Sequence, residues 1–213
     1  MRTLYTGLTC PRADYIHTPL IEIRPVEDAA PLRRALARIA SYDYLLVTSR
    51  HAVPPLVRYT ALLAQFTGPA AEGYPAGRLV AIGPTTAAAL RAAGFAAPAQ
   101  PAADNSYGVI DWFARQPRGR VLVPRSNLAL SIIPDGLRRL GFTVDCVTAY
   151  NTCMPANPRR IDLSTVDRIV FTSPSTVDNF LRLYGSLPAD KELIPRGPIT
   201  QKHLETIIKQ QQS

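Results

Sequence analysis

The sequence has few cysteines and no long apolar run. Its three cysteines, Cys10, Cys146 and Cys153, are odd in number and lack the spacing of a zinc site. We therefore expect them to be small buried hydrophobic side chains rather than disulfides or metal ligands. No apolar run approaches the roughly 20 residues that cross a bilayer, and residues 1–6 lack the apolar stretch of a signal peptide. We expect a cytoplasmic protein without membrane contact.

Common catalytic motifs are missing as well. The sequence contains no G-x-S-x-G elbow, no Walker loop, no G-x-G-x-x-G and no H-E-x-x-H. The three histidines, His17, His51 and His203, are isolated from one another, and we interpret each as a surface or structural residue. An enzyme with this sequence would depend on positioning and electrostatics more than on a reactive nucleophile.

Negative charge is in short supply, with 16 Asp and Glu against 24 Lys and Arg and a net charge of +8. Such an excess can attract nucleic acid, an anionic membrane or a polyanionic small molecule. The cations are scattered and form no basic block, which argues against nucleic-acid binding. All but Lys191, Lys202 and Lys209 are arginines, which suits bidentate binding of carboxylates, although an arginine-rich genome would leave the same composition.

Short apolar runs alternate with alanine- and leucine-rich stretches of helical period, a pattern typical of parallel sheets built from βα units. Glycine follows two of the helical stretches, at Gly94 and Gly141, where a helix C-cap is expected. The predicted strands are 44–47, 78–82, 120–123, 144–150 and 168–171, and the predicted helices are 52–64, 86–93, 130–140 and 177–184.

The chain also contains an internal repeat. Residues 43–53 match residues 167–177, and the Gly-Pro-x-Thr segment at 83–86 matches that at 197–200. A looser match relates 2–6 to 120–124. Three matches in the same order at similar offsets indicate a duplicated half, and the period is too long for a solenoid. We infer two similar α/β lobes, each large enough for a core of its own.

Polar residues gather where the predicted strands end and helices begin. The first turn of a helix has unpaired N–H groups and a positive dipole end, so such a junction binds anions. The simpler interpretation of each junction is N-capping, but five junctions in two matching sets favour an anion-binding cleft between the lobes. The junction residues are Thr48, Ser49, Thr85, Thr86, Arg125, Ser126, Thr172, Ser173, Ser175 and Thr200.

These segments, in this order, resemble the uroporphyrinogen-III synthase family. The resemblance extends from about residue 1 to about residue 204. Each segment is weak alone, but six in the family's order form a fairly specific signal. The segments that carry it are 19–24, 42–53, 80–90, 120–125, 144–152 and 169–177.

The resemblance implies an α/β fold of two flavodoxin-like parallel-sheet lobes joined by a two-stranded linker. Lobe one would comprise residues 1–24 and 151–213, and lobe two residues 27–148, with linkers near 25–26 and 149–150.

Two departures from the family fall in lobe one. Residues 8–15 are too few for the helix normally found there, and one helix follows Thr200 where the family has a further strand and helix. We therefore expect lobe one to be reduced.

The resemblance implies a cofactor-free hydro-lyase that needs no metal. Such an enzyme cyclises the linear tetrapyrrole hydroxymethylbilane with loss of water and inversion of the last pyrrole ring through a spiro intermediate. The substrate is a polycarboxylate, which fits a basic cleft. Spontaneous closure gives the wrong isomer, so orientation is the main task. We expect a monomer, with the enzyme that forms hydroxymethylbilane as a further partner.

The resemblance also implies roles for residues. Tyr150 matches the tyrosine after the family's sixth strand and would donate a proton to the leaving hydroxyl; the alternative is a linker aromatic that packs the lobes. Thr86 and Thr200 match paired threonines that face the substrate, although each alone could be a helix cap. The full predicted substrate-binding set is Thr48, Ser49, Thr85, Thr86, Asn105, Ser106, Arg125, Ser126, Thr172, Ser173, Ser175 and Thr200.

A second function stays open at this point. The reduced lobe one and the lack of an obligate acid or base would also fit a noncatalytic two-lobed binding protein for an anionic metabolite or tetrapyrrole.

Overall fold

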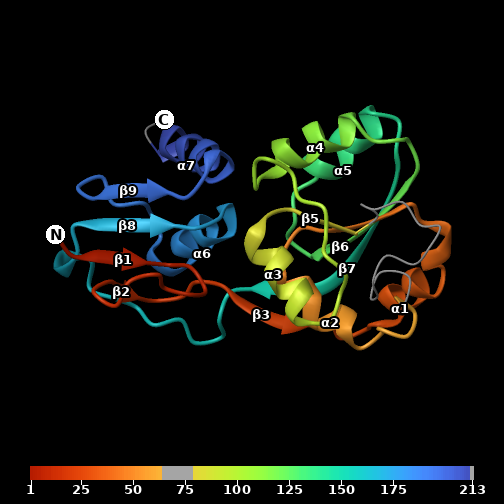
Figure 1. The fold of residues 1–213 in the computed structure, drawn as a ribbon. Helices are drawn as coiled ribbons and strands as arrows, with labels where there is room; N and C mark the ends of the chain where they lie inside the picture. Colours follow the sequence, from red (N-terminus) through yellow and green to blue (C-terminus); the bar gives the residue numbers. More distant parts are fainter. Residues whose placement is uncertain (64–78, 212–213) are drawn as a thin grey trace. The chain divides into compact units, whose positions relative to one another are not determined.

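The computed structural model describes residues 1–63 and 79–211. The chain divides by its internal contacts into two compact units (Figure 1). Unit 1 comprises Met1–Ile23 and Thr152–Ser213, and unit 2 comprises Arg24–Asn151. None of the helices in the described ranges combines the length and the hydropathy of a membrane span.

Unit 2 contains a five-stranded sheet in the order β3-β7-β6-β4-β5. The pairings of β4 with β5 and β6, and of β6 with β7, are parallel. Every residue of β4 and β5 is buried, as expected for central strands covered on both faces. The strands are β3 (Glu22–Pro25), β4 (Tyr44–Val47), β5 (Leu79–Ala81), β6 (Arg120–Ser126) and β7 (Thr143–Cys153).

The helices of unit 2 follow its strands and end where glycine allows. Gly94 after α3 and Gly141 after α5 have φ of 83° and 88°, the left-handed conformation of a helix C-cap. Short 3-10 turns lie at Ile39–Ser41 (η1) and Arg50–Ala52 (η2). The helices are α1 (Ala30–Ala37), α2 (Val53–Val57), α3 (Pro84–Ala92), α4 (Ser106–Ala114) and α5 (Ile132–Arg139).

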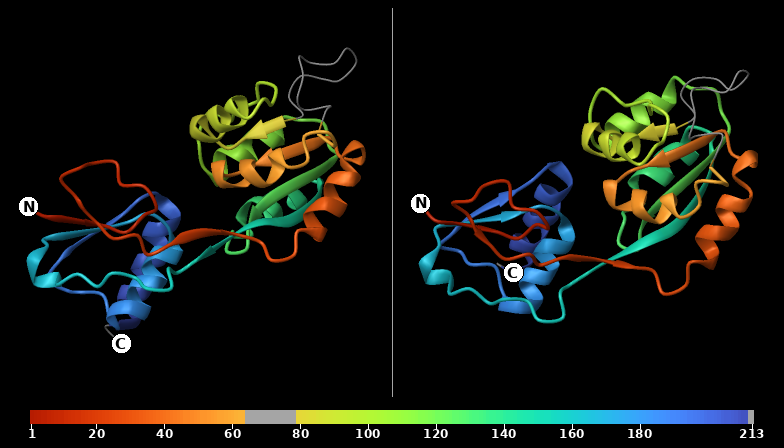
Figure 2. Two further views of the ribbon diagram at one scale, coloured as in Figure 1. Left: turned by 90° about the horizontal axis from the view of Figure 1, so that it is seen from below. Right: turned by 60° about the horizontal axis from the view of Figure 1, so that its bottom comes forward.

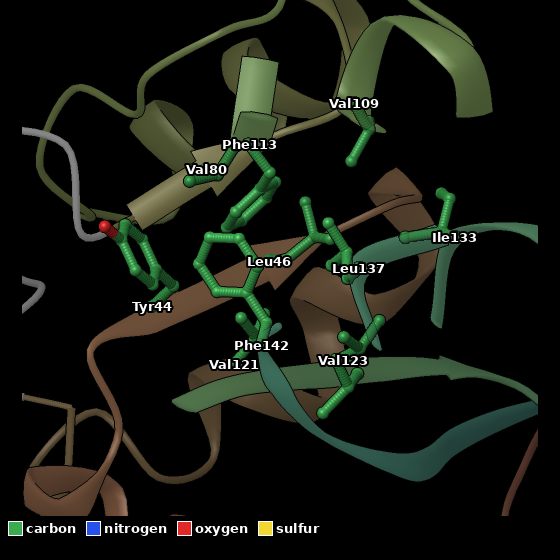
Figure 3. Close-up of a cluster of buried hydrophobic side chains, with 11 residues drawn as sticks. Tyr44, Leu46, Val80, Val109, Phe113, Val121, Val123, Ile133, Leu137 and Phe142 are labelled. Carbon is green, nitrogen blue, oxygen red and sulfur yellow. The ribbon is translucent and has the colours of Figure 1, made fainter. Parts of the chain in front are cut away.

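The core of unit 2 is built around three aromatic rings (Figure 3). Tyr44, Phe113 and Phe142 contact one another edge to face, with ring centroids 5.2 to 6.0 Å apart. Leu46 and Val121 pack beside them from β4 and β6. Because these rings join the sheet to α4, the packing holds the strands and the helix that carry the candidate site.

Unit 1 contains a four-stranded parallel sheet in the order β2-β1-β8-β9. Its helices α6 and α7 pack against each other and lie together beside the sheet in both views of Figure 2. Residues 6–15, between the first two strands, form no helix. The elements are β1 (Thr3–Tyr5), β2 (Ile16–His17), η4 (Leu163–Thr165), β8 (Arg168–Phe171), α6 (Pro174–Tyr184), β9 (Glu192–Pro195) and α7 (Pro198–Gln211).

The chain passes between the units in β3 and β7, which are neighbours in the sheet. The Asn151 side chain donates to the Pro25 carbonyl over 3.5 Å, and the Cys153 thiol lies 3.6 Å from the Glu22 carboxylate. Each segment that crosses is therefore held by the other.

Two sequence expectations about local structure are wrong. The helix predicted at 52–64 is five residues long, and the chain continues to Leu63 in tighter turns with i to i−3 hydrogen bonds; residue 64 lies outside the described residues. The cysteines are not buried: Cys10 and Cys153 are half-buried and Cys146 is exposed. Cys146 lies on β7 between the half-buried Asp145 and the buried Val147.

Candidate functional site

The polar residues predicted to form a site lie at the carboxyl ends of parallel strands in each unit (Figure 1). Parallel strands end at the same edge of a sheet, which is where α/β proteins bind ligands. The carboxyl edge of unit 2 comprises Thr48, Ser49, His51, Thr85, Thr86, Asn105, Ser106, Arg125, Ser126 and Tyr150. The carboxyl edge of unit 1 comprises Tyr5, Thr172, Ser173, Ser175, Arg196 and Thr200.

Tyr150 lies on β7 directly beside the end of β6. Its Cα partner across the ladder is Ser126, after a shift in register between Arg125 and Ser126. The Asn127 N–H donates to the Tyr150 carbonyl over 3.3 Å. The Ser126 hydroxyl accepts from the Leu128 N–H over 3.2 Å and turns the chain. The irregular register therefore brings the last residues of β6 next to Tyr150, as bulges at sheet edges often do.

The Tyr150 side chain is 7% exposed. Burial raises its pKa above the ordinary value of 10.0, while a hydrogen-bonding interaction with the Ser49 side chain and the positive charge of Arg125 act in the opposite direction. The phenol is therefore fully protonated at neutral pH and can donate a hydrogen bond or a proton.

Ser49 also fixes the turn that follows β4. It is the N-cap of η2, with extended backbone, and its hydroxyl accepts from the His51 N–H over 3.2 Å. The His51 ring lies against Tyr150, with centroids 6.0 Å apart. Thr48, between the strand and this cap, is half-buried. The capping interpretation of Ser49 is thus confirmed, and the same side chain reaches Tyr150.

The start of α3 differs from expectation. Pro84 occupies the first turn and Gly83 is the N-cap, so the cap has no side chain. Thr85 is exposed, and Thr86 is the third helical residue with 5% exposure. The interpretation of Thr86 as a helix cap is therefore wrong, because proline in the first turn moves the cap to the glycine before it.

Asn105, predicted only as a binding residue, is the N-cap of α4. Its Oδ1 accepts from the N–H groups of Tyr107 and Gly108 over 3.0 and 3.1 Å. Ser106, the next residue, is half-buried. The preceding residue, Asp104, lies so close to Gly83 that a Cβ there would be 2.5 Å from the Asp104 Cβ. The starts of α3 and α4 are therefore adjacent.

In unit 1 a residue outside the predicted set organises the start of α6. Thr176 is fully buried, and its hydroxyl accepts from the N–H groups of Thr172 and Ser173 over 3.1 and 3.2 Å. It also donates to the Ser173 carbonyl over 2.7 Å. The hydroxyls of Ser173 and Ser175 lie 2.8 Å apart. Thr176 thus occupies the main-chain N–H groups of Thr172 and Ser173, two residues that we predicted to bind substrate.

A sequence signal for Thr176 exists. Segments 83–86, 173–176 and 197–200 all have proline second and threonine fourth, and glycine or serine first. In all three the proline begins a helix and the threonine is its third residue. The pattern marks helix starts rather than a ligand site alone.

The start of α7 carries an arginine that sequence reasoning did not assign to the site. Arg196 is exposed at the end of β9, and its guanidinium donates to the Tyr5 hydroxyl over 3.2 Å. Thr200 is 3% exposed and is the third residue of α7, so it is not the cap. Arg196 could form an ion pair with a ligand carboxylate near the first amides of α7.

A groove in unit 1 lies away from the predicted site residues. It has a volume of about 940 Å³, runs along β9 and α7, and contains none of the predicted site residues. Among the residues that the structure describes, no three His, Cys, Asp or Glu side chains gather as metal ligands. The arrangement at the two carboxyl edges can bind anions and, at Tyr150, supply a proton.

Comparisons with known proteins agree on one family. The family described as uroporphyrinogen-III synthase HemD matches residues 12–208. A protein of Methanothermobacter thermautotrophicus with the provisional name uroporphyrinogen-III synthase is 28% identical over 204 residues, covering 88% of this chain and 78% of that protein.

Solved structures show the fold. A variant of uroporphyrinogen III synthase from the extremely thermophilic bacterium Thermus thermophilus superposes with a TM-score of 0.63 at 20% identity, covering 96% of this chain and 88% of that one. The Helicobacter pylori synthetase gives a TM-score of 0.60 at 19% identity, covering 97% of this chain and 89% of that one.

Proposed function

The chain belongs to the uroporphyrinogen-III synthase family, and we propose that it cyclises hydroxymethylbilane to uroporphyrinogen III, with loss of water and inversion of the last pyrrole ring. One observation carries the assignment to this chain's own residues. A buried, protonated phenol, Tyr150, lies among the helix starts and arginine of the unit 2 edge. That combination suits a polycarboxylate whose hydroxyl must leave.

In this proposal the two carboxyl edges bind the substrate's carboxylates. On the unit 2 edge we assign this role to Thr48, Thr85, Thr86, Ser106, Arg125 and Ser126, with Ser49 and Asn105 acting chiefly through the helix starts that they cap. On the unit 1 edge we assign it to Ser175, Thr200 and Arg196, while Thr172 and Ser173 would bind through atoms that Thr176 leaves free. Support comes from the first turn of α3, which no side chain caps, and from the absence of a carboxylate partner for Arg125 and Arg196 in the described residues.

We assign the acid role of a hydro-lyase to Tyr150. The phenol would protonate the terminal hydroxyl as the carbon–oxygen bond breaks, and water would leave. The last pyrrole ring would attack the electron-poor carbon left behind and form the spiro intermediate. The older bridge bond to that ring would then break and re-form at the ring's other α-carbon, which inverts the ring. Because spontaneous closure gives the other isomer, the bound conformation of the substrate determines the product.

We further propose that units 1 and 2 are flavodoxin-like lobes, with residues 1–24 and 151–213 in lobe one and 27–148 in lobe two. Both sheets support this, because each contains four strands in the spatial order second, first, third and fourth along the chain. These are β2-β1-β8-β9 in unit 1 and β5-β4-β6-β7 in unit 2. The cytoplasmic location, the monomeric state and the partnership with the hydroxymethylbilane-forming enzyme stay predictions.

The experiment that tests the function uses far less protein than substrate. Purified protein is mixed with a large molar excess of hydroxymethylbilane, and uroporphyrinogen III is measured over time. We expect many turnovers per protein molecule. Binding of the product without turnover would instead favour the noncatalytic binding protein.

A further inference from the structure

His51 differs from the other two histidines of the chain. The rings of His17 and His203 are held by the Gly7 carbonyl at 2.8 Å and by the Asp178 carboxylate at 2.7 Å. Neither ring nitrogen of His51 has a hydrogen-bond partner among the described residues. The residue is half-buried, so part of it packs against its neighbours and part stays exposed.

The position of His51 is fixed relative to Tyr150. Its backbone N–H donates to the Ser49 hydroxyl, and Ser49 in turn interacts with the Tyr150 side chain. The two rings are tilted by 58° with centroids 6.0 Å apart. It is also the one histidine between residues 24 and 151. Ser49 therefore contacts both residues, and their rings lie against each other.

The charges around His51 favour a neutral ring. Burial lowers its pKa below the ordinary value of 6.5, and the nearby positive charge of Arg50 lowers it further. The elements packed against η2 are α2, α3 and β6, and Tyr150 contacts the ring from β7. The titratable groups on these elements are Arg91, Arg120, Arg125, Asp145, Cys146, Tyr150 and Cys153.

Asp145, the single carboxylate among these groups, is not available to His51. It accepts from the Tyr42 hydroxyl over 2.7 Å and from Arg120 over 3.0 Å. A neutral imidazole with one free lone pair is a proton acceptor at physiological pH.

We propose that His51 is the proton acceptor that completes the reaction begun by Tyr150. This rests on the proposed function. The reaction breaks the bond between the terminal carbon and its hydroxyl, and the terminal carbon bonds to the last pyrrole at the carbon that already carries the neighbouring bridge. That bridge bond then breaks and re-forms at the pyrrole's other α-carbon, which loses its hydrogen. Tyr150 gives its proton to the departing hydroxyl, which leaves as water. His51 takes the proton released as the pyrrole regains aromaticity and returns it to the Tyr150 phenolate, so that both groups regain their starting states.

The test compares His51→Phe, which keeps a ring against Tyr150, with His51→Gln, which keeps a polar side chain. His203→Gln is the matched control in unit 1. Both His51 variants are expected to lose about 100-fold in kcat, the range of general acid–base catalysis, with KM within about twofold. His203→Gln is expected to keep wild-type kcat. Melting temperatures of all three establish that each variant is folded, and either His51 variant suffices if the other does not fold.

The pH profile separates proton transfer from packing. Wild-type kcat should fall as pH drops through a pKa below 6.5, because protonated His51 cannot accept a proton. That acid limb should be lost in the His51 variants and kept in His203→Gln. An acid limb that persists in a folded His51 variant, or wild-type kcat in it, would overturn the proposal.

A proton NMR titration of the histidines needs no turnover, so it distinguishes failure of this proposal from failure of the proposed function. A resonance that titrates below 6.5 should disappear in His51→Gln and stay in His203→Gln. A wild-type protein with this titration but no turnover would contradict the proposed function. If no resonance that His51→Gln removes titrates below 6.5, the His51 proposal is overturned, whatever the turnover.

Discussion

In unit 2 the helix α3 begins after Gly83, and in unit 1 the helix α7 begins after Gly197, both in a Gly-Pro-x-Thr segment. Gly83 has a φ of −173°, an extended conformation open to any residue, but a Cβ there would lie 2.5 Å from the Asp104 Cβ. Gly197 has a φ of 92° and open space around it. Gly83 is needed for close packing and Gly197 for its backbone conformation. Identical residues in the two repeated segments therefore do not imply identical local structure.

The same contrast extends to the tyrosine at each carboxyl edge. Tyr150 of unit 2 interacts with Ser49 and lies against His51, whereas the Tyr5 hydroxyl of unit 1 accepts from Arg196. A phenol that accepts from a guanidinium is suited to holding that cation in place. We therefore expect proton transfer at the unit 2 edge and carboxylate binding at the unit 1 edge.

The largest difference should appear between Tyr150→Phe and Tyr5→Phe. Loss of the Tyr150 proton donor is expected to lower kcat about 100-fold with little change in KM. Tyr5→Phe should raise KM and leave kcat near the wild-type value. Steady-state kinetics with hydroxymethylbilane measure both. Wild-type kcat in Tyr150→Phe would return this tyrosine to the packing role.

Gly83→Ala should lower the free energy of unfolding more than Gly197→Ala does. The new methyl group must displace Asp104, and overpacking of this kind costs about 2 kcal/mol of unfolding free energy. Asp104→Gly in the same chain should restore part of that loss. Urea unfolding of the two single variants and the double variant gives the coupling energy. Additive losses would show that the clash is not the cause.

Gly197→Ala should lower the free energy of unfolding by about 1 kcal/mol, because alanine is strained at positive φ even in open space. Gly197→Asn should cost less, since asparagine tolerates this region better. The same urea measurement applies. Equal losses for alanine and asparagine would contradict a backbone origin.

Arg196→Gln should have a smaller effect, confined to binding. Arg196 is exposed, so solvent screens its charge and we expect KM to rise only about threefold at constant kcat. Arg160 is the matched control, because its guanidinium lies 5.2 Å from the Tyr184 ring centre in the same unit. Arg160→Gln should leave KM unchanged. Equal KM values for the two variants would remove Arg196 from the binding set.

The smallest expected effect is a loss of unit 2 stability in alkali. Burial raises the pKa of Tyr150, and burial followed by the hydrogen bond to Asp145 raises that of Tyr42. The folded state thus holds both protons more tightly than the unfolded chain does. This contribution is complete below about pH 10 and is lost as pH rises through the raised pKa values. Urea unfolding between about pH 9 and pH 11 should show the decline, and Tyr42→Phe should make it shallower; an unchanged slope would contradict this origin.

The sequence predicted those strand bounds and helix ends that are determined by residues adjacent in the chain. The strands at 44–47 and 168–171 have the predicted bounds because each is a continuous apolar run. Gly94 and Gly141 marked two helix ends. Thr86 and Thr200 were misassigned as caps, since the effect of proline in the first turn was overlooked.

The contacts of the site could not be predicted in the same way. Ser49, His51 and Tyr150 meet because β7, β6 and β4 are successive strands of one sheet, and nothing in the residues near position 49 specifies that order. The occupation of the Thr172 and Ser173 amides by Thr176 depends on one side-chain rotamer. Strand order and rotamers are set by packing of the whole unit rather than by local pattern.

The isomer composition of the product decides whether this protein directs ring closure. Hydroxymethylbilane is incubated with increasing concentrations of wild-type protein, and the two uroporphyrinogen isomers are separated. The account predicts that the type III fraction rises with protein until it replaces type I almost entirely. Product that remains type I, formed at the spontaneous rate at every protein concentration, would contradict it.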